Sequence, residues 1–377
     1  MIKIINGDSI KELKKFPDNY FHSVVTDPPY GLSFMGKKWD YDVPSVELWT
    51  EVFRVLKEGG YLLSFAGTRT QHRMAVNIED AGFEIRDMIA WVYGSGFPKS
   101  HNIGKAVDKL QGNEREFIGE NIHSANRKGK YEGWNLGNEG KRYDTKGNSE
   151  WEGWGTALKP ALEPITMARK PFKTSVAENV LKNGVGGFNI DGCRVQTNEN
   201  CYRKPSTTEG TNTYGKSKMM GGLGNTQGRF PANFIHDGSD EVKDLLEESS
   251  RFFYCAKASK QDRNEGLEDF EEKQYSYDGR DKEIENAYQR NKSISNNNHP
   301  TVKPTDLMRY LVRLVTPKEG IVLDCFMGSG STGKACALEG FNFVGIDLDK
   351  DYCKIAKARI DKAIEDKRIM DSQMKLF

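Results

Sequence analysis

The stretch IVLDCFMGSGST, residues 321–332, decides the fold of this chain. Its first four residues, three apolar and then Asp324, are typical of a short buried strand, and a glycine-rich turn follows before a helical stretch that runs to Glu339. A strand, a glycine loop and a helix N-terminus together allow a cofactor to lie close to backbone amides. The spacing of Gly328, Gly330 and Gly333 comes near the Gly-x-Gly-x-x-Gly pattern of nicotinamide-binding loops.

A second strand pattern follows the glycine loop and ends in an acidic residue. Residues 341–346 are mostly apolar, and Asp347 comes about twenty positions after the loop, where a carboxylate can hold ribose hydroxyls. A nicotinamide site and an S-adenosylmethionine site both satisfy these features, so they leave the cofactor open.

Strand and helix patterns alternate in both end regions of the chain. This alternation predicts an α/β fold with a mostly parallel, doubly wound sheet covered by helices on both faces. The last helix follows the Asp347 strand. In a doubly wound sheet counted from the strand before the glycine loop, the strand that follows this helix would be the third. The N-terminal strand therefore resumes the sheet where the C-terminus stops, which predicts a circularly permuted order. Strands are predicted at about 2–6, 22–27, 60–66, 84–93, 163–169, 321–325 and 342–347, and helices at about 9–16, 45–57, 69–81, 305–315, 331–339 and 350–366.

The tetrapeptide Asp27-Pro28-Pro29-Tyr30 follows another apolar run, residues 23–26, and predicts chemistry on an amino group. The lone pair of an exocyclic amine is delocalised into its base ring, so the nitrogen needs two acceptors aimed at its hydrogens. The Asp27 carboxylate and the Pro28 carbonyl can supply that pair, because two successive prolines stiffen the turn. The Tyr30 ring offers a surface on which an extruded base can stack. Taken alone, the tetrapeptide is equally compatible with a rigid turn after a strand.

The chain resembles the β-class amino-methyltransferases of DNA, which make N6-methyladenine or N4-methylcytosine. In that class the catalytic tetrapeptide precedes the target-recognition region and the cofactor loop follows it, and this chain has the same order. The resemblance implies a Rossmann-like methyltransferase sheet, S-adenosylmethionine as cofactor and double-stranded DNA as substrate. It rests on residues 6–8, 27–30, 54–60, 299–304, 324–332 and 352–359, while 157–164 and 228–233 resemble a branch common in bacteriophage and mobile-element enzymes.

Residue roles follow from the resemblance, which makes the four residues of the tetrapeptide catalytic. Asp324 is expected near the amino group of the cofactor, Asp347 on its ribose hydroxyls and Asp8 near its adenine ring. Thr301 and Lys303 are expected to hold its carboxylate tail, although for Lys303 an ordinary surface lysine before a proline is the alternative. The expected cofactor-binding residues are Asp8, Thr301, Lys303, Asp324, Phe326, Gly328, Gly330, Ser331, Thr332 and Asp347.

The target base has two candidates, because adenine and cytosine both carry an amino group on a flat ring. Aspartate at the first position of the tetrapeptide favours N6 of adenine by resemblance, with N4 of cytosine as the alternative. RNA and protein-glutamine methyltransferases use related tetrapeptides but are not expected to share this permuted order. A non-catalytic DNA-binding protein has no use for Asp27, Asp324 and Asp347 together. The resemblance also admits a homodimer and a separately encoded restriction endonuclease as partners.

Composition agrees with this interpretation. The 377 residues allow two or three domains, although mean hydropathy is −0.69 and only 37% of residues are hydrophobic. No apolar stretch approaches the ~20 residues that span a bilayer, and the N-terminus lacks a signal pattern. A protein of the bacterial or phage-infected cytoplasm without membrane contact is therefore expected. The six cysteines lack zinc-type spacing, which predicts reduced, packed thiols and no metal site.

The middle of the chain is polar and locally basic, although the formal net charge is only +1. Between Cys201 and Ala232 it carries five basic residues and one acidic residue, among many Gly, Asn, Thr and Ser. Such a segment buries little apolar surface and can follow a phosphate backbone, with a solvated loop as the alternative. The expected DNA-contact residues are Arg203, Lys204, Lys216, Lys218 and Arg229.

Two long insertions interrupt the predicted sheet, which suggests binding functions or separate subdomains. The first is expected to be irregular and to form a wall of the DNA cleft, and the second ends in a linker-like stretch from Asp262. The expected division is residues 1–93 for the catalytic half, 94–157 for the inserted loop region, 158–171 for a returning strand, 172–298 for the target-recognition region and 299–377 for the cofactor-binding half.

Overall fold

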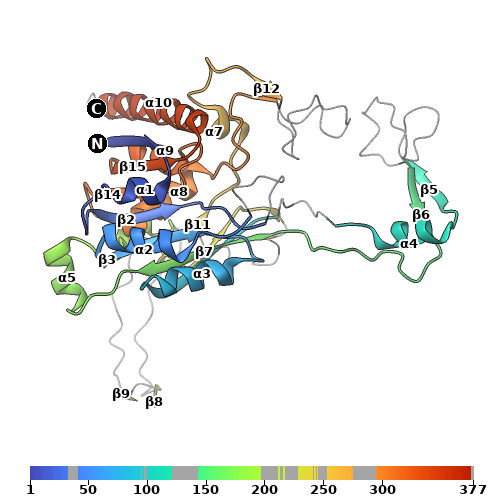
Figure 1. Cartoon of the computed structure of the whole chain (residues 1–377), viewed down its shortest axis with the longest axis horizontal. Coiled ribbons are helices and arrows are strands. Elements are labelled where there is room, and N and C mark those ends of the chain that lie inside the picture. The colour runs from blue at the N-terminus through green and yellow to red at the C-terminus, as the bar shows by residue number, and fades with distance from the viewer. Residues whose placement is uncertain are drawn as a thin grey trace.

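A nine-stranded sheet forms the centre of the structure, a computed structural model of the chain (Figure 1). The strand order is β1-β15-β14-β2-β3-β7-β4-β10-β11. Strand β7 runs antiparallel to both of its neighbours, and the other pairs within this sheet are parallel. The bounds are β1 Ile2–Asn6, β2 Phe21–Thr26, β3 Leu56–Phe65, β4 Glu84–Val92, β7 Leu162–Arg169, β10 Phe234–His236, β11 Phe253–Tyr254, β14 Ile321–Asp324 and β15 Asn342–Asp347.

The structure describes residues 1–32, 41–94, 96, 100–120, 143–196, 211–212, 215–216, 228–240, 242, 244, 253–274 and 294–374. Three further strand pairs within these ranges are β5 (Glu116–Glu120) with β6 (Tyr143–Lys146), β8 (Thr211–Asn212) with β9 (Gly215–Lys216), and β12 (Lys273–Gln274) with β13 (Ile294–Ser295). No helix among the described residues has both the length and the apolar character needed to cross a bilayer.

The predicted permutation is confirmed at the edge of the sheet. Strand β1 pairs in parallel with β15, so that Ile2 lies opposite Phe343 and Asn6 opposite Asp347. The Phe343 N–H also donates to the Met1 carbonyl at 2.9 Å. The first strand of the chain therefore continues the sheet beside the last one.

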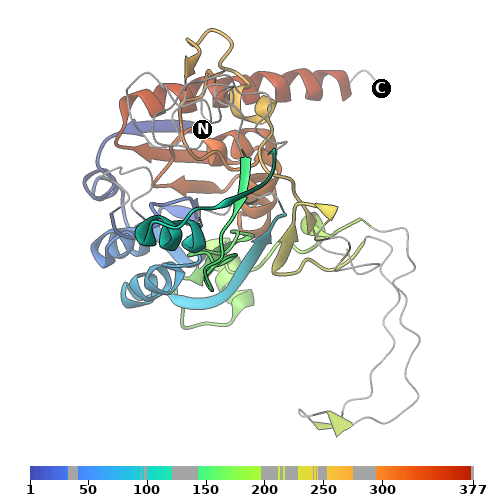
Figure 2. The ribbon, with the colours of Figure 1, turned by 90° about the vertical axis from the view of Figure 1, so that its right-hand side faces the viewer.

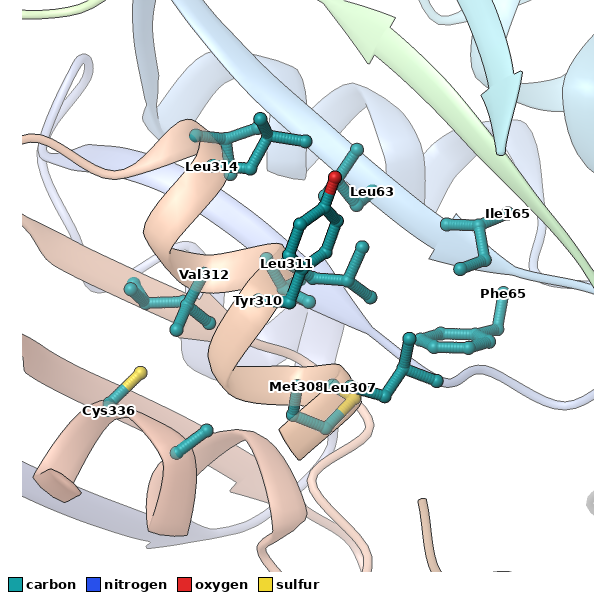
Figure 3. Close-up of a cluster of buried hydrophobic side chains, with 14 of the residues drawn as sticks. Leu63, Phe65, Ile165, Leu307, Met308, Tyr310, Leu311, Val312, Leu314 and Cys336 are labelled. Atoms are coloured by element: carbon teal, nitrogen blue, oxygen red, sulfur yellow. The ribbon is translucent and has the colours of Figure 1, made fainter. Parts of the chain in front are cut away.

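Helices cover both faces of the sheet, because alternate residues of its central strands point to opposite sides. Val24 and Leu62 belong to a buried cluster that includes residues of α1, α2 and α3. Val25 and Leu63 belong to a second cluster with α8, α9 and α10, part of which is drawn in Figure 3. The helices are α1 Ser9–Leu13, α2 Val46–Val55, α3 Gln71–Asp80, α4 Ile103–Gln111, α5 Val176–Asn183, α7 Lys260–Asn264, α8 Thr305–Val315, α9 Ser331–Glu339 and α10 Lys350–Met374.

All seven predicted strands are present, but some predicted element ends are wrong. Strand β3 begins at Leu56, directly after α2, although its start was expected near residue 60. Leu56 is fully buried and pairs with Phe21, whereas the polar Lys57 and Glu58 conceal this beginning in the sequence. Helix α1 ends early at Leu13, and α10 continues beyond 366 to Met374 through turns without an apolar pattern.

The insertion 94–157 is not irregular throughout, because it contains α4 and the β5–β6 pair. Arg115 on the segment between them pairs with the buried Asp108 and with Glu152, at 2.8 Å for the latter. The described residues of this unit bury this ion cluster and no hydrophobic side chain, which explains why hydrophobic patterns did not predict the unit. In Figure 1 the unit lies well away from the helices that cover the sheet, and Figure 2 shows it from a second side.

The expected target-recognition region also contributes to the sheet. Ile235 of β10 lies opposite Trp91 of β4, and β11 pairs with β10 in turn. These strands have three and two residues, which is too short for the alternation that predicts a strand. Part of residues 172–298 is therefore integrated with the nine-stranded sheet.

Gly330 is expected to be intolerant of substitution. It caps α9 with a φ of +78°, and a methyl group added there would lie 2.8 Å from the Ala356 side chain on α10. Gly330→Ala should lower the free energy of unfolding in urea by about 1–3 kcal/mol, because both the backbone and α10 must shift. Gly187→Ala is the control, since no atom lies within 4 Å of its added methyl group. Equal losses in the two variants would contradict this account.

Candidate active site

The carboxyl ends of four parallel strands meet at one edge of the sheet. Asp8 and Asp27 follow β1 and β2, while Asp324 and Asp347 end β14 and β15. Ligands of open α/β sheets bind at this edge, where the winding reverses. A cavity of about 1480 Å³ is lined by all four of these residues. Residues from both ends of the chain therefore border a common space.

Asp324 links the strand ends beneath the cavity. Its side chain is 2% exposed and accepts hydrogen bonds from the Thr26 hydroxyl at 2.7 Å and the Thr332 hydroxyl at 2.6 Å. The Phe326 N–H donates to it at 3.1 Å. Burial raises the pKa of Asp324 to about 6, although these three donors lower it. The carboxylate thus joins β2, β14 and the start of α9.

Asp347 holds the glycine loop against the end of β15. Its two oxygens accept from the Gly328 N–H at 2.7 Å and the Asp349 N–H at 2.8 Å. Burial raises the pKa of Asp347, and the two amide donors act in the opposite direction. The side chain still borders the cavity, so it can accept further hydrogen bonds from a ligand there.

His299 and Tyr352 form another wall of the cavity beside Gly328. Their rings pack edge to face with centroids 4.5 Å apart, and His299 Nδ1 lies 2.5 Å from the Thr301 carbonyl oxygen. A methyl group added at Gly328 would lie 2.6 Å from His299 Nε2. Burial lowers the pKa of His299 to about 4, which keeps the ring neutral near neutral pH. Sequence reasoning left both rings out of the expected site, although both lie in segments that carry the resemblance.

Arg359 fixes the glycine loop from α10. Its fully buried guanidinium donates to the Ser329 carbonyl at 2.5 Å and to the Asp262 carbonyl at 2.9 Å. Burial lowers the pKa of Arg359 to about 10, so it remains charged near neutral pH. The expectation that a linker starts at Asp262 is wrong at this residue, because its side chain also accepts from the Thr305 N–H and from Lys334.

The tetrapeptide Asp27 to Tyr30 carries a second charged cluster. The Tyr30 hydroxyl donates to Asp27 Oδ1 at 2.8 Å, and the Lys303 ammonium donates to Asp27 Oδ2 at 2.6 Å. Burial opposes the charge of Lys303, but Asp27 and Glu163 raise its pKa above the ordinary value. Burial together with the same two carboxylates raises the pKa of Tyr30, so its hydroxyl keeps its proton. The Lys303 ammonium therefore contacts Asp27 and Tyr30 of the tetrapeptide. Its predicted contact with the carboxylate tail of the cofactor stays a prediction.

Glu163 completes this cluster and was not among the expected site residues. Its Oε2 lies 3.3 Å from both the Tyr30 hydroxyl and the Lys303 ammonium, and its Oε1 accepts from the Tyr93 hydroxyl at 3.1 Å. Glu163 lies near the start of β7, in the segment 157–164 that carried the resemblance to bacteriophage enzymes. That resemblance was the signal in the sequence that could have identified Glu163 as a site residue, but it assigned no role to the segment.

The remaining expected residues divide into those that line the cavity and those that do not. Asp8 lines it and also caps α1, where it accepts from the Lys11 N–H at 3.0 Å. Gly330 lies behind the loop against Ala356. The others that line the cavity are Pro28, Pro29, Thr301, Phe326, Gly328, Ser331 and Thr332.

The expected DNA-contact residues are only partly within the described ranges. Arg203, Lys204 and Lys218 lie outside them, and Lys216 belongs to the short strand β9. The backbone of Arg229 pairs with Val195 through N–H to carbonyl bonds of 2.8 and 3.0 Å. DNA contact by these five residues stays a prediction.

The cysteines within the described ranges are packed thiols. Cys193, Cys255, Cys325, Cys336 and Cys353 are all buried and free. Burial raises the pKa of each of them, so these thiols stay protonated near neutral pH. Protonated, buried thiols are poor nucleophiles.

The order of these motifs corresponds to a known family, whose sequence model, described as DNA methylase, matches residues 21–358. The chain belongs to this DNA methylase family. Type II methyltransferase M.HindIII of Haemophilus influenzae is 24% identical over 95% of this chain and 94% of its own length. DNA adenine methyltransferase YhdJ of Escherichia coli is 38% identical over a shorter match, 18% of this chain and 22% of that protein.

Two solved structures align over most of this chain at low sequence identity. The M1.HpyAVI–SAM complex has a TM-score of 0.42 and 18% identity, with 96% of this chain and all of that chain covered. The cytosine-N4-specific PvuII DNA methyltransferase has a TM-score of 0.43 and 13% identity, with 94% of this chain and 85% of that chain covered.

The buried Asp324 should make this DNA methylase less stable as pH rises. Because its folded pKa of about 6 exceeds the ordinary value of 3.8, folding favours the protonated form, and that stabilisation disappears as pH rises through about 6. Asp324→Asn removes this titration. Between about pH 4 and 6 the free energy of unfolding of the variant should rise by up to about 3 kcal/mol relative to the wild type.

Urea denaturation at a series of pH values measures this difference. Asp361→Asn, an exposed position on α10, is the matched control and should follow the wild-type curve. A constant difference between Asp324→Asn and the wild type across this range would refute the buried titration.

Proposed function

We propose that this DNA methylase transfers a methyl group from S-adenosylmethionine to the N6 amino group of adenine in double-stranded DNA. The observation that carries the proposal is the shared cavity, which is bordered by Asp27 of the tetrapeptide and by Asp347 beside the glycine loop. A methyl donor and a methyl acceptor must meet in one enclosed space, because the transfer is direct. The family supports the methyl-transfer reaction, and Asp27 at the head of the tetrapeptide favours adenine.

The residues beside the glycine loop suit S-adenosylmethionine chemically. Asp347 offers carboxylate oxygens for ribose hydroxyls, and Phe326 offers an apolar ring for the cofactor's adenine. The N-terminus of α9 at Ser331 favours a carboxylate group, while the nearby acidic residues favour an ammonium group. A zwitterionic amino-acid tail matches both charges. When bound, the cofactor supplies a methyl group that passes to the amine nitrogen while the electron pair of the broken carbon–sulfur bond stays on sulfur.

The tetrapeptide positions the acceptor. The Asp27 carboxylate and the Pro28 carbonyl accept hydrogen bonds from the two amine hydrogens, which directs the nitrogen lone pair toward the methyl group. Positive charge develops on the nitrogen during transfer, and Asp27 stabilises it until one of the two amine protons leaves to water and the nitrogen becomes neutral. The Tyr30 ring, which lines the cavity, stacks on the extruded base. Homodimer formation, a separate endonuclease partner and a cytoplasmic location stay predictions.

The product identifies the target base. The protein is expressed in a host that lacks DNA methylation, and the digested host DNA is examined by mass spectrometry. N6-methyladenine is the expected product, and N4-methylcytosine in its place would overturn the proposed base. Single-molecule sequencing of the same DNA would give the recognition sequence.

Two substitutions should separate catalysis from cofactor binding. Asp27→Asn should slow methyl transfer by about a hundredfold or more, because a charged acceptor is lost from the amine. Its affinity for S-adenosylmethionine should stay within a few fold of the wild type. Asp347→Asn should lower the affinity for S-adenosylmethionine by about tenfold, because the ribose hydroxyls lose a carboxylate acceptor. Its transfer rate at saturating cofactor should stay near that of the wild type. Titration calorimetry and single-turnover kinetics measure both quantities, and near-normal transfer by Asp27→Asn would refute the mechanism.

A further inference from the structure

The carboxylates of Asp27 and Glu163 share the same two donors. The Lys303 ammonium lies 2.6 Å from Asp27 and 3.3 Å from Glu163, while the Tyr30 hydroxyl lies 2.8 Å from Asp27 and 3.3 Å from Glu163. The ammonium also donates to the Tyr30 oxygen at 3.1 Å. Each donor is therefore within a small movement of either carboxylate, and in this structure both lie closer to Asp27.

This arrangement conflicts with the chemistry expected of Asp27. An ammonium on Oδ2 weakens the carboxylate as an acceptor for an amine, since the two donors compete for the same charge. It also places a positive charge beside a nitrogen that becomes positive during methyl transfer, and in a buried site that repulsion is poorly screened. The Lys303 side chain is only 8% exposed, so water cannot readily replace Asp27 as its partner.

Glu163 is placed to receive the ammonium. Among the described residues it is the other carboxylate that pairs with Lys303. Its backbone is fixed in β7 between β3 and β4, and the Tyr93 hydroxyl holds its second oxygen at 3.1 Å. The ring of Phe65, 4.8 Å from the ammonium, adds a cation–π contact that does not depend on Asp27.

We propose that Glu163 is a positioning residue that takes the Lys303 ammonium and the Tyr30 hydroxyl from Asp27 when the target amine enters. Asp27 then accepts from the amine, so that the Lys303 ammonium pairs with Glu163 and the positive charge that develops on the nitrogen pairs with Asp27. The inference rests on the proposed methyl transfer to an amino group, and it holds for adenine and cytosine alike. Lys303 acts in this scheme as a movable cap on the catalytic carboxylate.

A double-mutant cycle tests the role of Glu163. Glu163→Gln keeps the size of the side chain and an acceptor for Tyr93 but removes the charge that attracts Lys303. The substrate is a DNA duplex that carries the sequence methylated by the wild-type protein. With saturating enzyme and cofactor, the single-turnover rate of methyl transfer by Glu163→Gln should be about 10- to 100-fold lower than that of the wild type. In a Lys303→Met background the same substitution should change the rate by no more than about twofold, because no ammonium then needs a second partner.

Three controls separate positioning from general damage. The affinity of Glu163→Gln for S-adenosylmethionine should stay within about twofold of the wild type, which also shows that the variant is folded. Glu163→Asp retains the charge and should recover part of the rate. If Lys303→Met does not fold, Lys303→Gln serves as the neutral background.

The outcomes distinguish this inference from the proposed function. If the wild type transfers methyl groups but Glu163→Gln is equally fast, the role of Glu163 is overturned while the proposed function stands. The same holds if Glu163→Gln slows transfer equally in the wild-type and Lys303→Met backgrounds. Absence of methyl transfer by the wild type overturns the proposed function and this inference with it. A slower methyl transfer in Glu163→Gln that is seen only when Lys303 is present supports the movement of the ammonium from Asp27 to Glu163.

Discussion

The hydrogen bond from Thr26 to Asp324 is the contact on which the site depends. It joins the ends of β2 and β14, two residues that lie 298 positions apart in the sequence. The tetrapeptide Asp27 to Tyr30 begins directly after Thr26, and the glycine loop begins directly after Asp324. Adjacent parallel strands lie about 4.8 Å apart, so this pairing fixes the distance between the two halves of the site. The permuted order separates the motifs in sequence without separating them in space.

Charge is concentrated at this edge at a cost to stability. Burial raises the pKa values of Asp324 and Asp347, which means that each ionised carboxylate is held against the preference of its surroundings. Hydroxyl and amide donors offset part of that cost. A ligand with an ammonium or hydroxyl group gains from the remaining negative potential. The edge is therefore less stable than an apolar one would be, and better suited to bind a polar, partly cationic ligand.

The sequence predicts the frame of this site better than its internal contacts. Strands and the glycine loop follow from local patterns, because burial on both faces produces recognisable apolar runs and tight turns require glycine. Glu163 has no such pattern, since its role arises from the pairing of β7 between β3 and β4. The ammonium of Lys303 could not be placed either, because its position depends on two carboxylates 276 and 140 positions upstream in the sequence. Long-range electrostatics of this kind leaves little trace in local sequence.

The segment from Glu163 to Asp262 contacts the edge of the sheet that carries the candidate site at both of its ends. At one end Glu163 meets Lys303 and Tyr30 beside the tetrapeptide. At the other the Asp262 carbonyl accepts from Arg359, which also holds Ser329 in the glycine loop. The residues between these anchors include β10 and β11, which extend the same sheet. The segment from Glu163 to Asp262 is therefore held beside the site by the pairing of β10 and β11 in the sheet as well as by these polar contacts.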